Sequence, residues 1–200
     1  MLIGIARLTL AALIAGAPVP VFAQAPRPNA DQKPAENPPA PPLRIEDLFE
    51  KLKAAKDVAD ARNFADQIQR IWSRSGSDTA DLLMKRTTQA VEKKDSDLAL
   101  DLLDSILALE PQWPEAWYRR AVVHIMREDL DSAMRDLNTV LTREPRHFRA
   151  WTQLGFIMMK VDRKKTALEA FKRAHELHPH EEQIEKTIER IGKDVEGEKA

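Results

Sequence analysis

The chain of 200 residues carries 31 basic and 32 acidic side chains, for a formal net charge of −1, and it contains no cysteine. This nearly balanced and interleaved charge excludes the basic surface typical of nucleic-acid-binding proteins. The lack of cysteine excludes disulfides, thiolate metal sites and acylation of an N-terminal cysteine.

Residues 1–23 are predicted to be a secretory signal peptide. One charge, Arg7, precedes an apolar run over 8–17, which is shorter than the ~20 residues of a membrane-spanning helix. Val21 and Ala23 stand three and one places before a cleavage site expected after Ala23. A retained N-terminal anchor is the alternative. Export without disulfides or Asn-x-Ser/Thr acceptors favours a bacterial periplasm, with no stable membrane span after cleavage.

Residues 24–42 are predicted to be a disordered, extended linker. Seven of these nineteen residues are proline and none is large and apolar, so the segment cannot bury enough surface to order itself. A proline-rich ligand for an aromatic groove is the other interpretation of such a composition.

Residues 43–76 are expected to form a degenerate N-terminal pair of helices that ends at Gly76. Its apolar residues recur at helical spacing in two groups. These are Ile45, Leu48, Phe49 and Leu52, then Phe64, Ile68, Ile71 and Trp72.

From residue 77 to residue 181 the sequence repeats every 34 residues. The landmarks in register are Pro111, Pro145 and Pro179, then Trp117 and Trp151, then Ala99, Ala133 and Ala167. A period of this length predicts a series of helix-turn-helix units. The units are 80–113, 114–147 and 148–181, followed by a C-terminal capping helix and tail over 182–200. Nine helices are expected in all, and the fold class is all-α.

The third unit resembles the tetratricopeptide repeat, whose pattern W-x2-L-G-x2-Y…A-x3-F…P it meets almost fully. The matching residues are Trp151, Leu154, Gly155, Met158, Ala167, Phe171 and Pro179. This resemblance implies a right-handed α-solenoid. Within the family, the chain resembles exported bacterial members of the cell envelope.

The prolines and tryptophans mark the joints between units. Pro111 ends one helix, and Pro114 occupies the first position of the next, where a missing N–H costs nothing. Trp117, Trp151 and Leu154 are assigned to packing. Arg86 and Arg120 stand where the family has leucine, and each is expected to pair with an acid of an adjacent helix. The acids considered are Asp104 and Glu110.

No arrangement of residues predicts catalysis, a cofactor or a metal site. His175, His178 and His180 lie close together but lack the carboxylate spacing of a metalloprotease, so a solvated joint is favoured over a metal site. There is no cysteine nucleophile and no glycine-rich phosphate loop.

The family resemblance implies that the first helices of the units line a concave groove. The positions concerned are Asp81, Met84, Thr88, Val91, Glu92, Glu115, Tyr118, Val122, Ile125, Met126, Arg149, Thr152, Phe156, Met159 and Lys160. Of these, the predicted peptide-binding residues are Met84, Thr88, Tyr118, Val122, Ile125, Arg149, Phe156 and Met159. Tyr118 and Met159 are expected to be exposed, whereas Val122, Ile125 and Phe156 can equally be core.

The predicted function is a non-enzymatic periplasmic scaffold that binds a peptide or helix of an envelope protein in this groove. A periplasmic holdase for unfolded exported chains is the alternative, favoured by the methionines. No nucleic-acid partner is expected, and the oligomeric state is left open.

Overall fold

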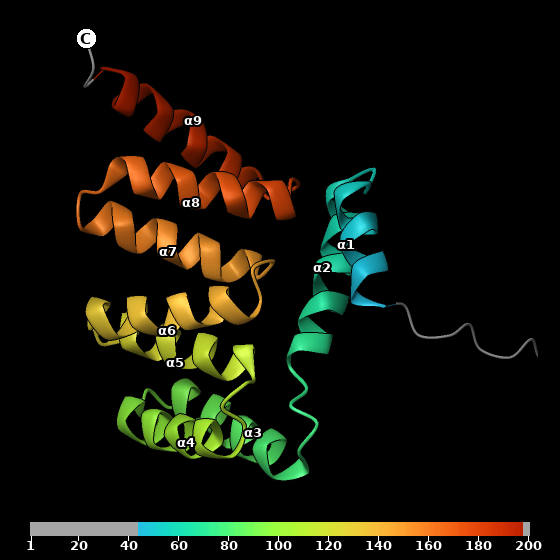
Figure 1. Cartoon of the computed structure of the whole chain (residues 1–200), viewed down its shortest axis with the longest axis vertical. Helices are drawn as coiled ribbons and strands as arrows, with labels where there is room; N and C mark the ends of the chain where they lie inside the picture. The colour runs from blue at the N-terminus through green and yellow to red at the C-terminus, as the bar shows by residue number, and fades with distance from the viewer. Residues whose placement is uncertain (1–43, 198–200) are drawn as a thin grey trace, which may run out of the picture. The chain divides into compact units, whose positions relative to one another are not determined.

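The computed structural model describes residues 44–197, and over this range the chain forms nine α-helices and no strand (Figure 1). The expected signal peptide, the expected linker and the end of the tail lie outside the described residues. The helices are α1 (Ile45–Lys53), α2 (Val58–Trp72), α3 (Asp78–Glu92), α4 (Ser96–Leu109), α5 (Pro114–Met126), α6 (Leu130–Arg143), α7 (Phe148–Lys160), α8 (Lys164–Leu177) and α9 (Glu182–Gly197). The predicted all-α class and helix count are confirmed.

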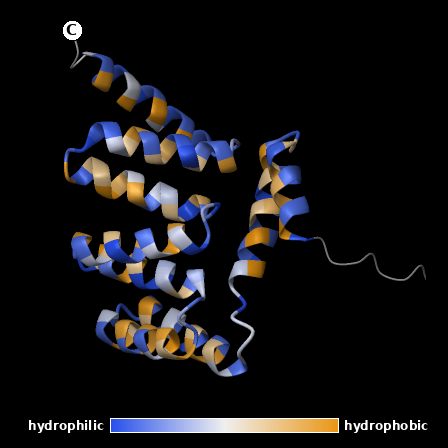
Figure 2. Cartoon of the chain, viewed as in Figure 1, coloured by the Kyte–Doolittle hydropathy of each residue, from blue (hydrophilic) through white to orange (hydrophobic). Residues whose placement is uncertain are grey.

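Helices α3 to α8 form three successive hairpins, and α9 packs on the last of them (Figure 1). Each hairpin packs on the next through its second helix, α4 against α5 and α6 against α7. Figure 2 shows that apolar and polar residues alternate along these helices, as amphipathic helices in a layered stack require. The predicted α-solenoid is therefore confirmed.

The two helices of each hairpin reverse direction through the same three-residue turn. Its middle residue adopts a left-handed conformation without being glycine: φ is 60° at Lys94, 62° at Glu128 and 56° at Asp162. The amide of the following residue donates to a carbonyl five residues back, as in Asp95 N to Ala90 O at 2.9 Å, which closes the first helix. Asp95 and Asp129 then cap the second helix by accepting from backbone amides.

Small residues allow the paired helices to approach closely, as the repeat pattern predicts. A Cβ atom added at Gly155 of α7 would lie 2.7 Å from the ring of Phe171 in α8. Phe171 itself is completely buried. The tryptophans close the joints, because the indole Nε1 of Trp117 donates to Pro111 O and that of Trp151 to Pro145 O, both at 2.9 Å. Both indoles are partly buried against the core, so their assignment to packing holds.

Arg120 pairs with acids of two neighbouring helices, and only one of these was expected. Its Nη1 donates to Asp104 Oδ1 at 2.6 Å, as predicted, while Nε and Nη2 both donate to Asp136 at 2.8 Å. The guanidinium also lies 4.7 Å from the ring of Trp117, and these hydrogen bonds raise the pKa of Arg120. Glu110 is not a partner. The matching expectation for Arg86 is wrong, because Arg86 is exposed and forms no ion pair with the described residues.

The helices α1 and α2 do not form another layer of the stack. In the described range, the closely packed pairs are α1 with α2, the consecutive pairs from α3 to α9, and α1 with α8; α2 and α3 are not among them. Residues 73–77 connect α2 to α3, and Gly76 has φ +84° there. The pair instead builds a separate small core from Leu48, Phe49, Leu52, Ile68 and Trp72, which Phe148 of α7 completes.

Helix α9 ends the described chain. Its Ile184, Ile191 and Val195 are buried on one face, and the other face is charged. Among helices α1 to α9, none is both long and apolar enough to cross a membrane.

Candidate peptide groove and the α2 seam

The predicted groove residues are divided between an open part and a part that helix α2 covers. In the open part, Met84, Val122 and Met159 are half-buried, Thr88 is exposed, and Phe156 is 45% exposed. Ile125 is half-buried against the main core, so it serves packing at least in part. Tyr118 is only 2% exposed, and the expectation of an exposed Tyr118 is therefore wrong.

The open part contains an apolar hollow of about 100 Å³ between α3 and α5. Met84, Thr88 and Val91 line it from α3, and Val122 lines it from α5. A hollow of this size accommodates one aliphatic side chain. We call it the apolar hollow.

A second hollow of about 400 Å³ adjoins the first and shares Met84, Thr88 and Arg119 with it. Arg70, Arg74 and Lys85 supply further positive charges at this basic hollow. Both of its acids are engaged. Asp81 accepts hydrogen bonds from the hydroxyl and amide of Ser75 at 2.6 and 3.0 Å, which lower the pKa of Asp81. Glu115 belongs to the covered part.

Helix α2 covers the N-terminal ends of α5 and α7 through an aromatic stack. The indole of Trp72 lies parallel to the imidazole of His147, at 4.3 Å between ring centroids and 7° between planes. The ring of Phe148 lies 5.4 Å from the same indole. The carbonyl of Trp72 accepts a 2.7 Å hydrogen bond from the indole of Trp113. We call this contact between α2 and the repeats the α2 seam.

The polar half of the α2 seam depends on Gln69. Its Nε2 donates to Glu115 Oε1 and its Oε1 accepts from Arg149 Nη1, both at 2.9 Å. Arg149 also lies 5.1 Å from the ring of Tyr118. The side chain of Gln69 therefore joins α5 to α7, and Arg149, predicted to bind a peptide, is already engaged within the chain.

Glu115 and His147 form a buried polar pair beneath α2, at 1% and 0% exposure. His147 Nδ1 accepts from the amide of Ala150 at 3.1 Å, so Nε2 carries the proton and faces Glu115 Oε2 at 3.5 Å. Burial alone would raise the pKa of Glu115, but the hydrogen bond from His147 and the charge of Arg119 hold it below its usual value. Glu115 is therefore ionised at neutral pH. Burial similarly raises the pKa of Tyr118.

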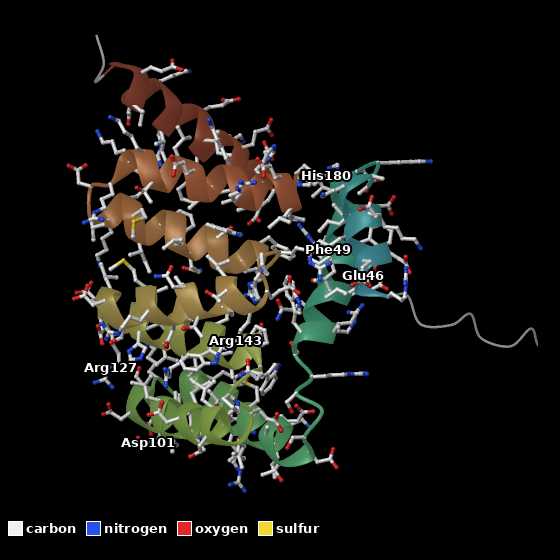
Figure 3. The ribbon with its side chains drawn as sticks, viewed as in Figure 1. Glu46, Phe49, Asp101, Arg127, Arg143 and His180 are labelled. Carbon is white, nitrogen blue, oxygen red and sulfur yellow. The ribbon has the colours of Figure 1, made fainter. Side chains whose placement is uncertain are left out.

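Helix α1 is connected to the repeats through Arg146, in the joint between α6 and α7. The guanidinium of Arg146 lies 4.7 Å from the ring of Phe49 and 3.9 Å from the carboxylate of Glu46; both α1 residues are labelled in Figure 3. Hydrogen bonds to Glu144 fix the guanidinium and raise the pKa of Arg146.

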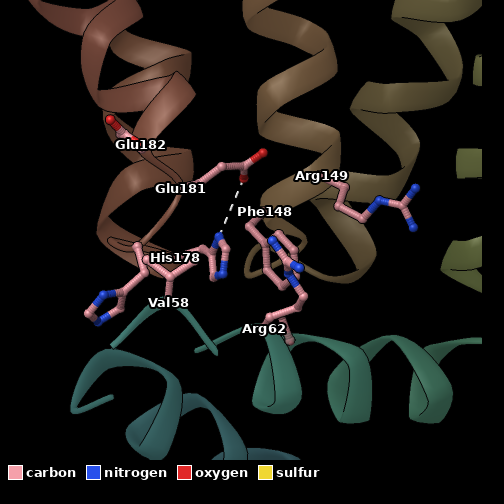
Figure 4. Close-up of a pocket in the computed structure, with 9 residues that line it drawn as sticks. Val58, Arg62, Phe148, Arg149, His178, Glu181 and Glu182 are labelled. Carbon is pink, nitrogen blue, oxygen red and sulfur yellow. Dashed lines mark hydrogen bonds and ion pairs between the residues drawn. The ribbon is translucent and has the colours of Figure 1, made fainter. Parts of the chain in front are cut away.

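A third hollow, of about 410 Å³, lies where α2, the start of α7 and the α8–α9 turn meet (Figure 4). His178 stacks on Phe148 at 5.3 Å, and its Nδ1 lies 3.3 Å from Glu181 Oε2. Since the side chain of His178 is only 13% exposed, the joint is less solvated than expected. Within residues 44–197, no three His, Asp or Glu side chains lie close enough to hold a metal ion.

The sequence contains signals for some of these features and not for others. Glu115 and Tyr118 stand at groove positions that the repeat assigns, whereas His147 and Gln69 match no part of the repeat pattern. Gln69 and Arg149 are 80 residues apart, so no local spacing indicates their contact.

Comparisons with known proteins agree with this fold. No protein-family model matches the chain. A TPR repeat-containing protein of Rhizobium etli is 36% identical over 121 residues, which cover 60% of this chain and 58% of that protein. The chain thus spans less than two thirds of its relative.

Solved structures with low sequence identity share the same fold. The Sgt2 TPR domain from Aspergillus fumigatus is similar with a TM-score of 0.55 and 21% identity, over 60% of this chain and 81% of that one. The first TPR domain of Spaghetti (RPAP3), bound to an HSP90 peptide, gives 0.55 and 17%, over 58% and 92%. The MamA protein gives 0.55 and 17%, over 77% and 83%. With its 34-residue period and stacked hairpins, this chain has the tetratricopeptide repeat fold and is similar in sequence to a TPR repeat-containing protein.

Proposed function

We propose that the protein is a non-enzymatic scaffold that binds a peptide or helix of a partner protein in the open part of its concave groove. The observation that carries this proposal is the apolar hollow, which joins the basic hollow to form one continuous site. An aliphatic side chain fits the first, and acidic groups of the same segment complement the second.

Two structural neighbours support peptide binding by this fold. The Spaghetti domain is bound to an HSP90 peptide, and the TPR2B domain of yeast Sti1 is in a complex named for pHsp70. Their identity to this chain is 17% in both cases, so the likeness extends to the fold and not to the ligand.

The proposed location is the bacterial periplasm, and the proposed partner is a protein of the cell envelope. The support is the signal-peptide pattern of residues 1–23 and the proline-rich segment of 24–42. Fractionation of cells that express the full chain, with N-terminal sequencing of the mature protein, tests this location. A cytoplasmic protein that retains residue 1 would contradict it.

The groove is tested with a pair of threonine variants. Thr88→Arg extends a charged side chain over the apolar hollow, whereas Thr142→Arg makes the same change on the second helix of another repeat. Both threonines are exposed, and each donates to the carbonyl four residues earlier, at 3.1 and 2.8 Å, so the local disturbance is matched.

The partner is first identified by crosslinking capture from the native envelope and then titrated against each variant. We expect Thr88→Arg to weaken binding at least tenfold, or ~1.4 kcal/mol, and Thr142→Arg to leave it unchanged. Equal weakening by both variants would place the binding surface outside the groove.

A holdase is the second candidate function. It is favoured by the apolar side chains left open on the first helices, Met126 at 49% and Phe156 at 45% exposure. A holdase protects many denatured clients with similar weak affinity, whereas a scaffold selects one partner, so competition by unrelated denatured proteins separates the two.

A further inference from the structure

We propose that the surface beneath α2 is a helix-binding site that the α1–α2 pair occupies within the chain. Its partner in trans would be an amphipathic helix that presents an aromatic residue one turn after a glutamine, as α2 does. We call this surface, formed by Glu115, Tyr118, His147, Phe148 and Arg149, the docking face. The inference extends the proposed function, since it adds a second, gated surface to the scaffold.

The first argument is the way in which α2 meets the repeats. Within the stack, neighbouring helices approach over alanine and glycine, and α2 is not among their closely packed pairs. It meets the repeats mainly through the side chains of Gln69 and Trp72, and the backbone carbonyl of Trp72 also accepts a hydrogen bond from Trp113. This interface can separate without disturbing the stack, because the repeats keep their own cores.

The second argument is the chemistry of the contact. Glu115 and Arg149 are charged, and Gln69 supplies one hydrogen bond to each. When α2 leaves, water can satisfy these polar groups, whereas the rings of Tyr118 and Phe148 lose their cover, so the face favours an occupant that brings an aromatic side chain of its own. Gln69 and Trp72 stand three places apart on α2, and this spacing defines the helix that the face accepts.

The third argument is that the α1–α2 pair is built to move as one body. Leu48, Phe49, Leu52 and Ile68 pack on one another, with Phe148 of α7 and Leu177 of α8 at the edge of this core, and residues 73–77 are the covalent link to α3. A pair tethered so closely has a local concentration of about millimolar, so only a partner with matching chemistry can displace it. Because the pair must leave before a partner binds, the apparent affinity of any partner is its intrinsic affinity multiplied by the fraction of time that the docking face is open.

The experiment uses the full chain and, as its probe, a fluorescein-labelled peptide of residues 44–73. Gln69→Ala in the full chain weakens the internal occupant and leaves the docking face intact. Gln67→Ala is the matched control, because the one hydrogen bond of the Gln67 side chain within residues 44–197 goes to Asn63 of the same helix. Since the chain has no cysteine, Glu46→Cys with Arg146→Cys can be joined by a short bis-maleimide, which locks α1 to the α6–α7 joint without altering the face.

Fluorescence anisotropy gives the affinity of the probe for each protein. We expect Gln69→Ala to bind the probe at least tenfold more tightly than the wild-type chain, Gln67→Ala to match the wild type, and the locked chain not to bind. Equal affinity for Gln69→Ala and the wild type, no binding to any of them, or binding that survives the lock would each overturn the proposal.

A change in the probe itself supplies a second readout. A probe that carries Gln69→Ala should bind the Gln69→Ala chain at least tenfold less tightly than the unmodified probe does; equal binding would show that Glu115 and Arg149 do not select the helix. The two proposals fail separately, because partner capture is measured at Thr88 and probe binding at Gln69.

Discussion

Replacing Arg120 by leucine tests whether the buried ion pair stabilises the second repeat. Leucine is the residue that the repeat pattern favours here, and on sequence grounds alone the change should be tolerated. The structure predicts the opposite. The carboxylate of Asp136 is 5% exposed, and both of its hydrogen bonds from a charged donor come from Arg120.

The magnitude follows from the charge that the variant leaves behind. Removing one partner of a buried pair costs about 3–5 kcal/mol, because the remaining charge stays desolvated. The Arg120 side chain is 21% exposed, so water reaches part of the site, and we expect a decrease at the lower end of this range, about 3 kcal/mol, in the free energy of unfolding. In a chain of this size that is a decrease in Tm of roughly 6–12 °C.

A double variant provides the control that the repeat itself suggests. Leu154 and Ala170 stand 34 residues after Arg120 and Asp136. Arg120→Leu with Asp136→Ala therefore copies the third repeat into the second, removes both charges and should recover most of the lost stability. Urea unfolding followed by circular dichroism measures all three proteins. An Arg120→Leu variant as stable as the wild type would refute the reasoning.

Three further predictions follow from contacts described above. Gly155→Ala should lower the free energy of unfolding by about 1–3 kcal/mol, since its Cβ would lie 2.7 Å from an aromatic ring. Gly192→Ala, whose Cβ would have no neighbour within 4 Å, should raise the free energy of unfolding by about 0.5–1 kcal/mol. Chemical denaturation distinguishes the two signs. The pKa of Glu115 in the folded protein is below its ordinary 4.5, so the ionised carboxylate stabilises the fold above that pH, and this contribution is lost as the pH falls through the folded pKa. The difference in stability between the wild type and Glu115→Gln should therefore shrink below about pH 4.5. A difference that stays constant with pH would contradict the assigned pairing. In thermal melts, Tyr118→Ala should lower the free energy of unfolding by about 3 kcal/mol and Met159→Ala by about 1 kcal/mol, because Tyr118 is fully buried and Met159 is half-buried. Equal losses of stability would contradict the burial of Tyr118.

The fold could be predicted from the sequence because the information that specifies each hairpin is local. Pro114 at the first position of α5, the small residue at Gly155 and the 34-residue period act within one repeat or between adjacent repeats. Even the Arg120–Asp104 ion pair could be predicted from the sequence, since it joins consecutive helices.

The seam could not be predicted because its contacts are distant in sequence and depend on where a short connection directs α2. Trp72 belongs to an apolar pattern that indicates a buried side chain, but the pattern does not indicate which helix that side chain packs against. The groove positions of the family predict an exposed Tyr118, because they cannot show that another part of the chain covers it. Asp136 was missed because the repeat places an alanine at the equivalent position of the next unit, Ala170.

The outer face of α3 opposes the stacking of a further repeat at the start of the solenoid. Ala116 and Ala150 are 0% exposed, because the preceding hairpin covers them, but the equivalent residue of α3 is Leu82, which is 52% exposed. A further repeat stacked there would press its second helix against a bulky side chain where the other joints have a methyl group, an overpacking that costs about 1–3 kcal/mol. The same clash opposes end-to-end addition of another solenoid. Leu82 thus acts as a terminator that disfavours open-ended, head-to-tail filaments of stacked repeats.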